Sequence, residues 1–194
     1  RAARPAGDVR HLARWALLAT AAVLLGCAAQ PLHDTRRSGF EDMGPAVQAM
    51  QRDDFMNPAM LAVQGGEQAW QRSVGGGPSC ASCHGGPAAM RGVAARYPAW
   101  DTPLARPVNL ATRINLCRER HQGLPPWQPE FQELVQLEAW IGLQSRGLPI
   151  APPADARLQA HRARGEALFQ QRLGQLSLSC AQCHAQRAGL RLGS

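Results

Sequence analysis

The sequence carries the pentapeptide Cys80-Ala81-Ser82-Cys83-His84 and repeats its pattern as Cys180-Ala181-Gln182-Cys183-His184. Two cysteines separated by two residues and followed directly by histidine form the attachment pattern of c-type haem. On a helix, positions three apart share a face, so both sulfurs can reach one porphyrin, and the histidine can ligate its iron. We therefore expect two covalently bound haem c groups. Cys80, Cys83, Cys180 and Cys183 would form the thioether bonds, and His84 and His184 would ligate the two irons.

Two other chemistries use paired cysteines. A four-cysteine zinc site would need both motifs to converge across a spacing longer than zinc ribbons use, and it would leave His84 and His184 without a role. A thioredoxin-like redox site requires a strand before the motif within a βαβ unit, and we find no such pattern. Both alternatives are weaker than haem attachment.

The residues before the two motifs are also similar. Gly66-Glu67 with Trp70 precedes the first motif, and Gly165-Glu166 with Phe169 precedes the second. Self-similarity of this kind indicates an internal duplication. The fold class that we predict is mainly α, with tandem class I cytochrome c-like domains of which the second is incomplete. Residues 30–150 would form the first domain, and residues 151–194 would begin the second.

Hydrophobic periodicity and proline positions predict the remaining elements. The clearest helix runs over 130–145. A period near 3.6 residues is formed by Phe131, Leu134, Leu137 or Glu138, and Ile141, and Trp140 broadens this apolar face. Together with a helix that starts near Leu61, it gives the order of elements of a class I cytochrome c domain, in which a first and a last helix cross beside the haem. We also expect a short helix at 45–52, a loop at 97–107 and a helix at 110–120.

Residues 1–29 read as an export signal. Arginines precede the apolar run Trp15–Leu25, which is too short to span a bilayer comfortably. Leu24-Leu25-Gly26-Cys27 resembles a lipoprotein processing box, whereas Cys27-Ala28-Ala29 offers an ordinary cleavage site. Either route leads out of the cytoplasm, so we expect a periplasmic protein without a membrane span. The net charge is +7, but no basic patch interleaved with aromatic residues indicates a nucleic-acid partner.

Cys117 is the best candidate for the distal ligand of the first haem iron. It lies on a predicted helix, and a ferric iron would stabilise its thiolate and so hold its pKa down. Met90 follows His84 closely for a ligand on the opposite haem face, and His121 has the surroundings of a surface residue. An inert buried cysteine is the alternative interpretation of Cys117.

Several further stretches resemble SoxA, the dihaem cytochrome subunit of the sulfur-oxidising SoxAX complex. The likeness covers nearly all of residues 38–194 and is more specific than haem attachment alone. The stretches are Ser38–Glu41, Asp53–Pro58, Gly92–Pro98, Arg106–Leu110, Arg113–Cys117, Gln144–Ile150 and Leu178–His184.

The resemblance implies an activity and partners. SoxAX is a periplasmic L-cysteine S-thiosulfotransferase that joins thiosulfate oxidatively to a cysteine of the carrier protein SoxYZ, while electrons leave through haem. SoxA forms a heterodimer with the monohaem subunit SoxX. By position, the resemblance makes Cys117 the distal ligand of the first haem. It also implies that the catalytic cysteine, which ligates the second haem, lies beyond Ser194, so we assign no catalytic residue and expect the second domain to be truncated.

Two rival functions stay open at this point. A dihaem electron carrier without sulfur chemistry would use methionine or histidine as distal ligand. A dihaem peroxidase would need one haem with an open coordination position.

Overall fold

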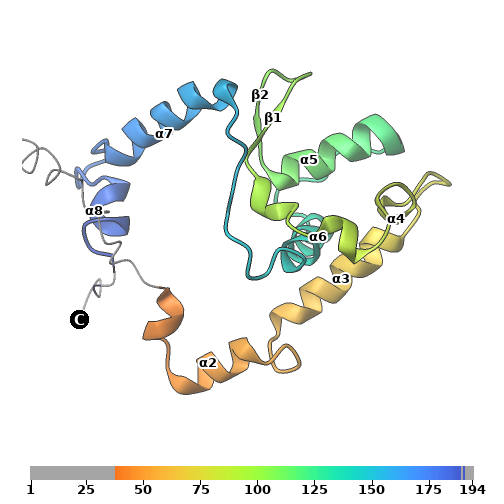
Figure 1. Cartoon of the computed structure of the whole chain (residues 1–194), viewed down its shortest axis with the longest axis horizontal. Coiled ribbons are helices and arrows are strands. Elements are labelled where there is room, and N and C mark those ends of the chain that lie inside the picture. The colour runs from red at the N-terminus through yellow and green to blue at the C-terminus, as the bar shows by residue number, and fades with distance from the viewer. Residues whose placement is uncertain (1–37, 189, 191–194) are drawn as a thin grey trace, which may run out of the picture. The chain divides into compact units, whose positions relative to one another are not determined.

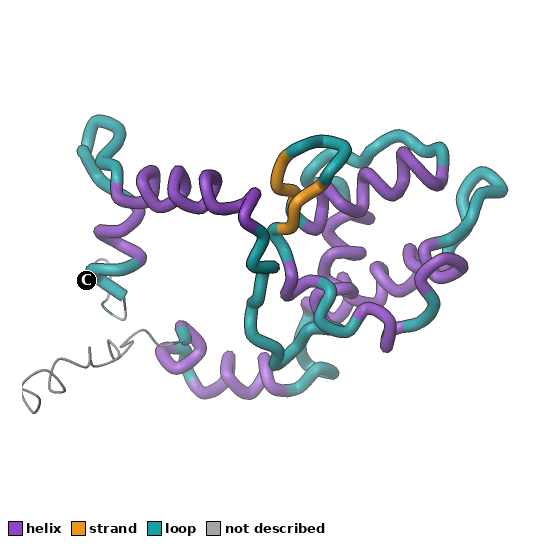
Figure 2. Tube along the Cα trace, turned by 45° about the horizontal axis from the view of Figure 1, so that its top comes forward, coloured by secondary structure: helices purple, strands orange, loops and turns teal. Residues whose placement is uncertain are grey.

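The computed structural model describes residues 38–188 and residue 190, which fall within one compact unit. Helices make up most of this part of the chain, and they are accompanied by a single two-stranded hairpin among the described residues (Figures 1 and 2). The prediction of a mainly α chain is therefore confirmed. The predicted export signal at residues 1–29, with its lipoprotein alternative at Cys27, lies outside the described residues.

The helices follow one another with short connections. Short 3-10 segments at Gly39–Asp42, Pro87–Met90, Ala94–Arg96 and Ala156–Leu158 connect or begin them. The α-helices are α2 (Pro45–Arg52), α3 (Ala59–Gln71), α4 (Cys80–His84), α5 (Leu110–Cys117), α6 (Gln132–Leu143), α7 (Gln159–Gln170) and α8 (Cys180–His184).

The core is built where α3 crosses α6, as predicted for the first and last helices of a cytochrome c-like domain. A Cβ atom added at Gly66 of α3 would meet the backbone carbonyl oxygen of Gln136 and would lie 2.7 Å from the Cβ of Trp140. The two backbones approach closely because position 66 has no side chain. The buried core cluster comprises Trp70, Met90, Ile114, Leu134, Leu137, Trp140 and Ile141.

The prediction of a loop over 97–107 is wrong in part. Strand β1 (Ala99–Asp101) pairs with β2 (Arg106–Val108) in an antiparallel hairpin, with Ala99 opposite Val108 and Trp100 opposite Pro107. A two-stranded sheet has only edges, so a proline that lacks an N–H group is tolerated there. The prolines that suggested a loop are therefore compatible with a short hairpin.

Two predicted helices have different ends in the structure. The segment expected to be helical over 110–120 is α-helical only to Cys117 and continues as a π-helix over Arg118–Gln122. The wider turn ends at Gly123, whose φ of 65° lies in the left-handed region. Helix α6 is shorter than the predicted 130–145, although Leu134, Leu137, Trp140 and Ile141 are buried on it as expected. Phe131, predicted on the same face, precedes the helix and is exposed.

The internal duplication has a structural counterpart. Helix α3 leads through a turn to α4, and α7 leads through a turn to α8.

Trp100 on the hairpin contacts two residues of the C-terminal part. Its ring lies 5.9 Å from the ring of His161, and the guanidinium of Arg157 lies 5.3 Å from the centroid of the Trp100 ring. These contacts connect α7 and the turn before it to β1. A domain boundary at residue 150 stays a prediction.

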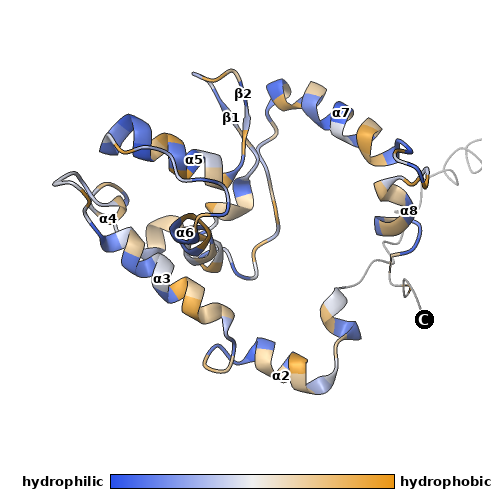
Figure 3. Cartoon of the chain, turned by 180° about the vertical axis from the view of Figure 1, so that it is seen from behind, coloured by the Kyte–Doolittle hydropathy of each residue, from blue (hydrophilic) through white to orange (hydrophobic). Residues whose placement is uncertain are grey.

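The N-terminal described segment contains hydrophobic residues along α2 and α3 (Figure 3), and several of those in this segment are exposed. In the turn between α2 and α3 the Phe55 side chain is 94% exposed, and Met56 and Leu61 are exposed beside it in sequence. Asp54 fixes this turn to the end of α6 through a bidentate ion pair with Arg146, at 2.8 and 2.9 Å. In the described part of the chain, no helix has the length and apolar character needed to cross a bilayer.

Replacing Gly66 by alanine should destabilise the protein, because the new methyl group would collide with the α6 backbone at Gln136. Overpacking of this kind typically costs about 1–3 kcal/mol, which a lower urea midpoint of the haem-loaded protein would reveal. Gly142→Ala is the matched control, since nothing lies within 4 Å of its added Cβ. The control should be neutral or more stable by up to about 1 kcal/mol. Equal midpoints for the two variants would contradict the close packing inferred at Gly66.

Candidate functional site

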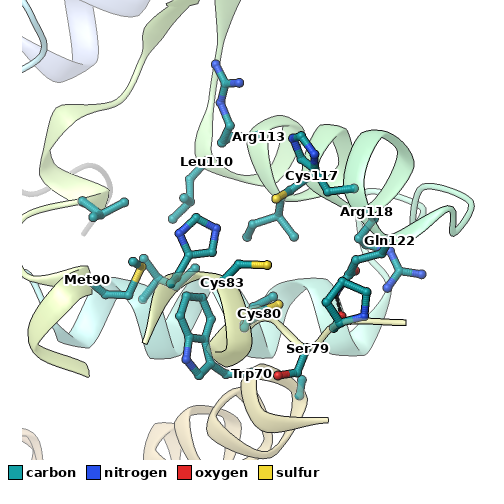
Figure 4. Close-up of a pocket in the computed structure, with 18 of the residues that line it drawn as sticks. Trp70, Ser79, Cys80, Cys83, Met90, Leu110, Arg113, Cys117, Arg118 and Gln122 are labelled. Carbon is teal, nitrogen blue, oxygen red and sulfur yellow. Dashed lines mark hydrogen bonds between the residues drawn. The ribbon is translucent and has the colours of Figure 1, made fainter. Parts of the chain in front are cut away.

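A cavity of about 380 Å³ lies between α3, α4, α5 and α6, and its size falls within the range of small-molecule and cofactor pockets (Figure 4). Apolar side chains of the core form part of its wall, including Trp70, Leu137 and Ile141. The predicted haem-site residues Cys80, Cys83, His84 and Cys117 all line it as well.

Helix α4 presents the first motif from one side of the cavity. Its first turn is capped by Ser79, whose hydroxyl accepts a hydrogen bond from the Ser82 backbone N–H at 3.1 Å. This short helix directs the sulfurs of Cys80 and Cys83 into the cavity (Figure 4). The motif thus has the helical geometry that attachment of both cysteines to one porphyrin requires.

Trp70 connects the core to the end of α4. Its Nε1–H donates to the carbonyl oxygen of Gly85 at 2.9 Å. Its ring lies 5.7 Å from the ring of His84 and 4.7 Å from that of Trp140. The α3–α6 core therefore supports the segment that carries the predicted proximal ligand. The sequence analysis used the matching positions of Trp70 and Phe169 only as a sign of duplication, although the same match could have indicated a role for the aromatic ring.

Cys117 enters the cavity from α5, and its sulfur points toward the side from which Cys80 and Cys83 project (Figure 4). The N-terminus of α5 is capped by Asn109, which accepts from the Thr112 N–H at 2.8 Å. In the protein alone, burial raises the pKa of the Cys117 thiol, while the nearby Arg113 lowers it. A bound cation would be needed to favour the thiolate fully.

The other two candidates for the distal ligand also line this cavity. Met90 belongs to the buried core cluster with Trp70 and Leu137. His121 lies on the π-helix that follows Cys117 and is exposed. The structure therefore brings Cys117, Met90 and His121 to one cavity, in surroundings that differ in burial.

The second motif forms a similar helix in a different environment. Ser179 and Gln182 make a capping box, in which each side chain accepts a hydrogen bond from the other residue's N–H, at 3.3 and 2.8 Å. Cys180 and His184 are exposed, and Cys183 is half-buried. None of these three residues lines the cavity of the first motif.

The donor set of the cavity fits a covalently attached haem. Two cysteines on one helical face, a histidine that follows them and a sulfur across the cavity supply the attachment points and axial ligands that haem c uses. The zinc alternative needs the two cysteine pairs to meet, and they do not. Over residues 38–188, no group of three or more His, Cys, Asp or Glu side chains is placed to hold a metal ion.

Charged residues that the sequence analysis did not single out connect the β1–β2 hairpin to α5 and the turn after it. The Asp101 side chain is only 1% exposed and forms an ion pair with Arg113 at 2.8 Å. It also accepts from both terminal nitrogens of Arg120, at 3.1 and 3.2 Å, and from the Leu104 N–H at 2.9 Å. We call Asp101, Arg113 and Arg120 the Asp101 cluster. The hydrogen bonds from Arg120 are the main cause that lowers the pKa of Asp101 to about 2.

Arg118 is a buried cation at this wall. Its guanidinium lies 3.5 Å above the Trp127 ring and donates to the Pro125 carbonyl oxygen, at 3.1 and 3.2 Å. Burial lowers its pKa. No local pattern in the sequence distinguishes Arg118 or Asp101 from the surface residues around them, since their partners are set by tertiary contacts.

Comparison with known proteins identifies relatives of this chain. Residues 65–150 match the family model of the SoxA/TsdA cytochrome c domain. The chain is 39% identical over 159 residues to the L-cysteine S-thiosulfotransferase subunit SoxA of Pseudaminobacter salicylatoxidans, a match that covers 80% of this chain and 56% of that protein. It is 34% identical over 157 residues to the SoxA subunit of Paracoccus pantotrophus, which covers 80% of this chain and 54% of that protein.

A solved structure shares the fold. The crystal structure of SoxXA from P. pantotrophus matches with a TM-score of 0.76 and 33% identity, over 83% of this chain and 61% of that chain. The predicted cytochrome c-like fold class is thereby confirmed. The chain spans about half the length of the curated relatives that it matches.

The Asp101 cluster predicts a specific loss of stability in acid. Because the pKa of Asp101 is about 2 in the folded protein and about 3.9 in an unfolded chain, the carboxylate stabilises the fold fully above about pH 4. This contribution is lost as the pH falls through about 2. Urea midpoints of the parent protein and Asp101→Asn should therefore differ at pH 6 and converge toward pH 2. A difference that stays constant over this range would contradict the assignment.

Proposed function

We propose that this chain, whose residues 65–150 match the family model of the SoxA/TsdA cytochrome c domain, is the dihaem cytochrome subunit of a SoxAX-type L-cysteine S-thiosulfotransferase. The family match and the likeness to SoxA imply covalently bound haem c. The observation that carries the proposal for this chain is the single cavity that holds Cys80, Cys83, His84 and Cys117. Cys80 and Cys83 would hold the first haem, with His84 and Cys117 as its axial ligands.

The second motif is proposed to hold a second haem through Cys180 and Cys183, with His184 as proximal ligand. Support comes from the repeated pattern and from the similar capped helix, α8. Its distal ligand is unassigned, as is the catalytic cysteine. In the SoxA family one cysteine has both roles, and no residue of this sequence matches it.

The proposed reaction joins thiosulfate to a cysteine thiol of a SoxYZ-type carrier. A sulfur–sulfur bond forms, the thiol proton is released and two electrons leave, which bound haem c would accept. The residues of the first site contribute by holding the haem: the helical motif offers two thioether attachment points, and a cysteine sulfur faces them across the cavity. An anionic sulfur ligand favours ferric over ferrous iron, so such a haem has a low reduction potential.

A monohaem SoxX-type subunit is the proposed partner, and the periplasm is the proposed location. The likeness to a chain of the SoxXA structure supports the partner. The export signal read at residues 1–29 supports the location. The exposed Phe55, Met56 and Leu61 also offer apolar surface of the kind that subunit contacts cover.

A dihaem electron carrier without sulfur chemistry is the second candidate. It is favoured by one observation, namely that Met90 and His121 also line the cavity. Either residue would supply the distal ligand that such carriers use.

Haem counting tests the two attachment sites. Protein matured in a host with c-type haem assembly should keep its haem colour on a denaturing gel, and its mass should correspond to two haems. The double variants Cys80→Ala/Cys83→Ala and Cys180→Ala/Cys183→Ala should each retain one. Extraction of all colour into acidified organic solvent would show that neither haem is covalent, and a mass with one haem in the parent would refute the second site.

Exchange of the distal ligand tests Cys117 and separates the two candidate functions. A thiolate-ligated low-spin ferric haem has its own electron paramagnetic resonance spectrum at low temperature, and Cys117→Met should abolish that signal for the first haem. The reduction potential should rise, because a neutral thioether stabilises ferric iron less than a thiolate does. Met90→Leu is the control and should leave the spectrum unchanged. If Met90→Leu changes it and Cys117→Met does not, the electron-carrier interpretation is correct.

A further inference from the structure

Asp101 is a carboxylate that is fully buried in the protein interior. Its side chain is among the largest that are fully buried, together with Leu134 and Leu137. A buried carboxylate is costly unless it is paired and hydrogen-bonded. Here two arginines and one backbone N–H satisfy it. Leu104 lies in the hairpin with Asp101, so among the partners of Asp101 the two arginines are the ones that join the hairpin to another element.

Both arginines flank Cys117 along the chain. Arg113 precedes Cys117 by one helical turn on α5, where residues four apart share a face, and both line the cavity. Arg120 lies on the π-helix that begins directly after Cys117. The single carboxylate of Asp101 therefore holds the chain on both sides of the cysteine.

The segment after Cys117 is a π-helical turn. Such turns are rare and are frequently found at functional sites. Arg118 holds one side of this turn through Trp127 and Pro125. The Asp101 cluster holds the other side through Arg120. His121, which also lines the cavity, lies on the same turn, so a displacement of the turn would move an alternative ligand as well as Cys117.

We infer that Asp101 is a positioning residue for the first haem: through Arg113 and Arg120 it fixes α5 and the following π-helical turn so that the sulfur of Cys117, and not another side chain, faces the iron. This inference rests on the proposed function, in which the cavity holds haem and Cys117 is its distal ligand. Asp101 itself does not line the cavity.

The test compares Asp101 with Asp54, which also forms a bidentate pair with one arginine but lies at the surface. Asp101→Asn weakens the Asp101 cluster, whereas Asp54→Asn weakens the bidentate pair between Asp54 and Arg146, neither of which lines the cavity. Both variants are made in the haem-loaded protein with Cys180→Ala and Cys183→Ala, so that only the first haem contributes. Electron paramagnetic resonance gives the ratio of thiolate-ligated to other ferric forms, and a denaturing gel confirms that haem is attached.

We expect Asp101→Asn to lower this ratio by about tenfold, because a neutral amide in place of the buried carboxylate would hold Arg113 and Arg120 less strongly than a charge-assisted pair does. The reduction potential should become heterogeneous or rise. Asp54→Asn should change neither quantity. An unchanged ratio and potential in Asp101→Asn, with the thiolate signal present in the parent, would overturn the inference.

A second variant keeps the test decisive if Asp101→Asn does not fold. Arg120→Gln leaves Asp101 paired with Arg113 and releases only the π-helical turn, so it should lower the ratio by a smaller factor. An unchanged ratio in this variant would then overturn the inference. Absence of a thiolate signal in the parent protein is a different result, because it would refute Cys117 as the ligand and hence the proposed function of the site.

Discussion

The close crossing of α3 and α6 at Gly66 is the constraint on which the first site depends. Because no side chain separates the two backbones there, Trp70 of α3 can pack against Trp140 of α6 and still reach Gly85 and the ring of His84. Leu137 and Ile141 of α6 then form cavity wall on the same side. A contact between two backbones thus determines where the predicted proximal histidine lies.

The opposite wall is built on a different principle. Around Cys117 it is organised by charged residues: the buried carboxylate of Asp101 binds the partly exposed Arg113 and Arg120, and the buried Arg118 packs on Trp127. Such interactions are directional, whereas apolar packing tolerates small shifts. Two of the cations, Arg113 and Arg118, line the cavity. The site thus combines an apolar wall beside the attached motif with a polar wall beside the sulfur that faces it.

The features that could be predicted from sequence are those with local signals. The repeated pentapeptide indicates both short helices, and the period of Leu134, Leu137 and Ile141 indicates the core face of α6. Asp101 and Arg118 could not be found in this way, because their burial depends on residues that only the folded chain brings together. The hairpin was missed because Pro98, Pro103 and Pro107 resemble loop signals, and the π-helical turn has no sequence pattern of its own. The pentapeptide of the second motif does not indicate how far Cys180, Cys183 and His184 are exposed, because their exposure depends on tertiary contacts.

Trp100 and Asp101 are neighbours on β1, yet they serve different parts of the molecule. Successive strand residues point to opposite faces, and here Trp100 contacts Arg157 and His161 while Asp101 contacts α5 and the turn after it. If the chain were divided in the proline-rich stretch after residue 150, Trp100 would lose its contacts with Arg157 and His161. Its indole would then be more exposed to solvent on a strand of three residues. The apparent linker is therefore a poor place to divide this protein, and a stand-alone N-terminal half would need a polar replacement at Trp100.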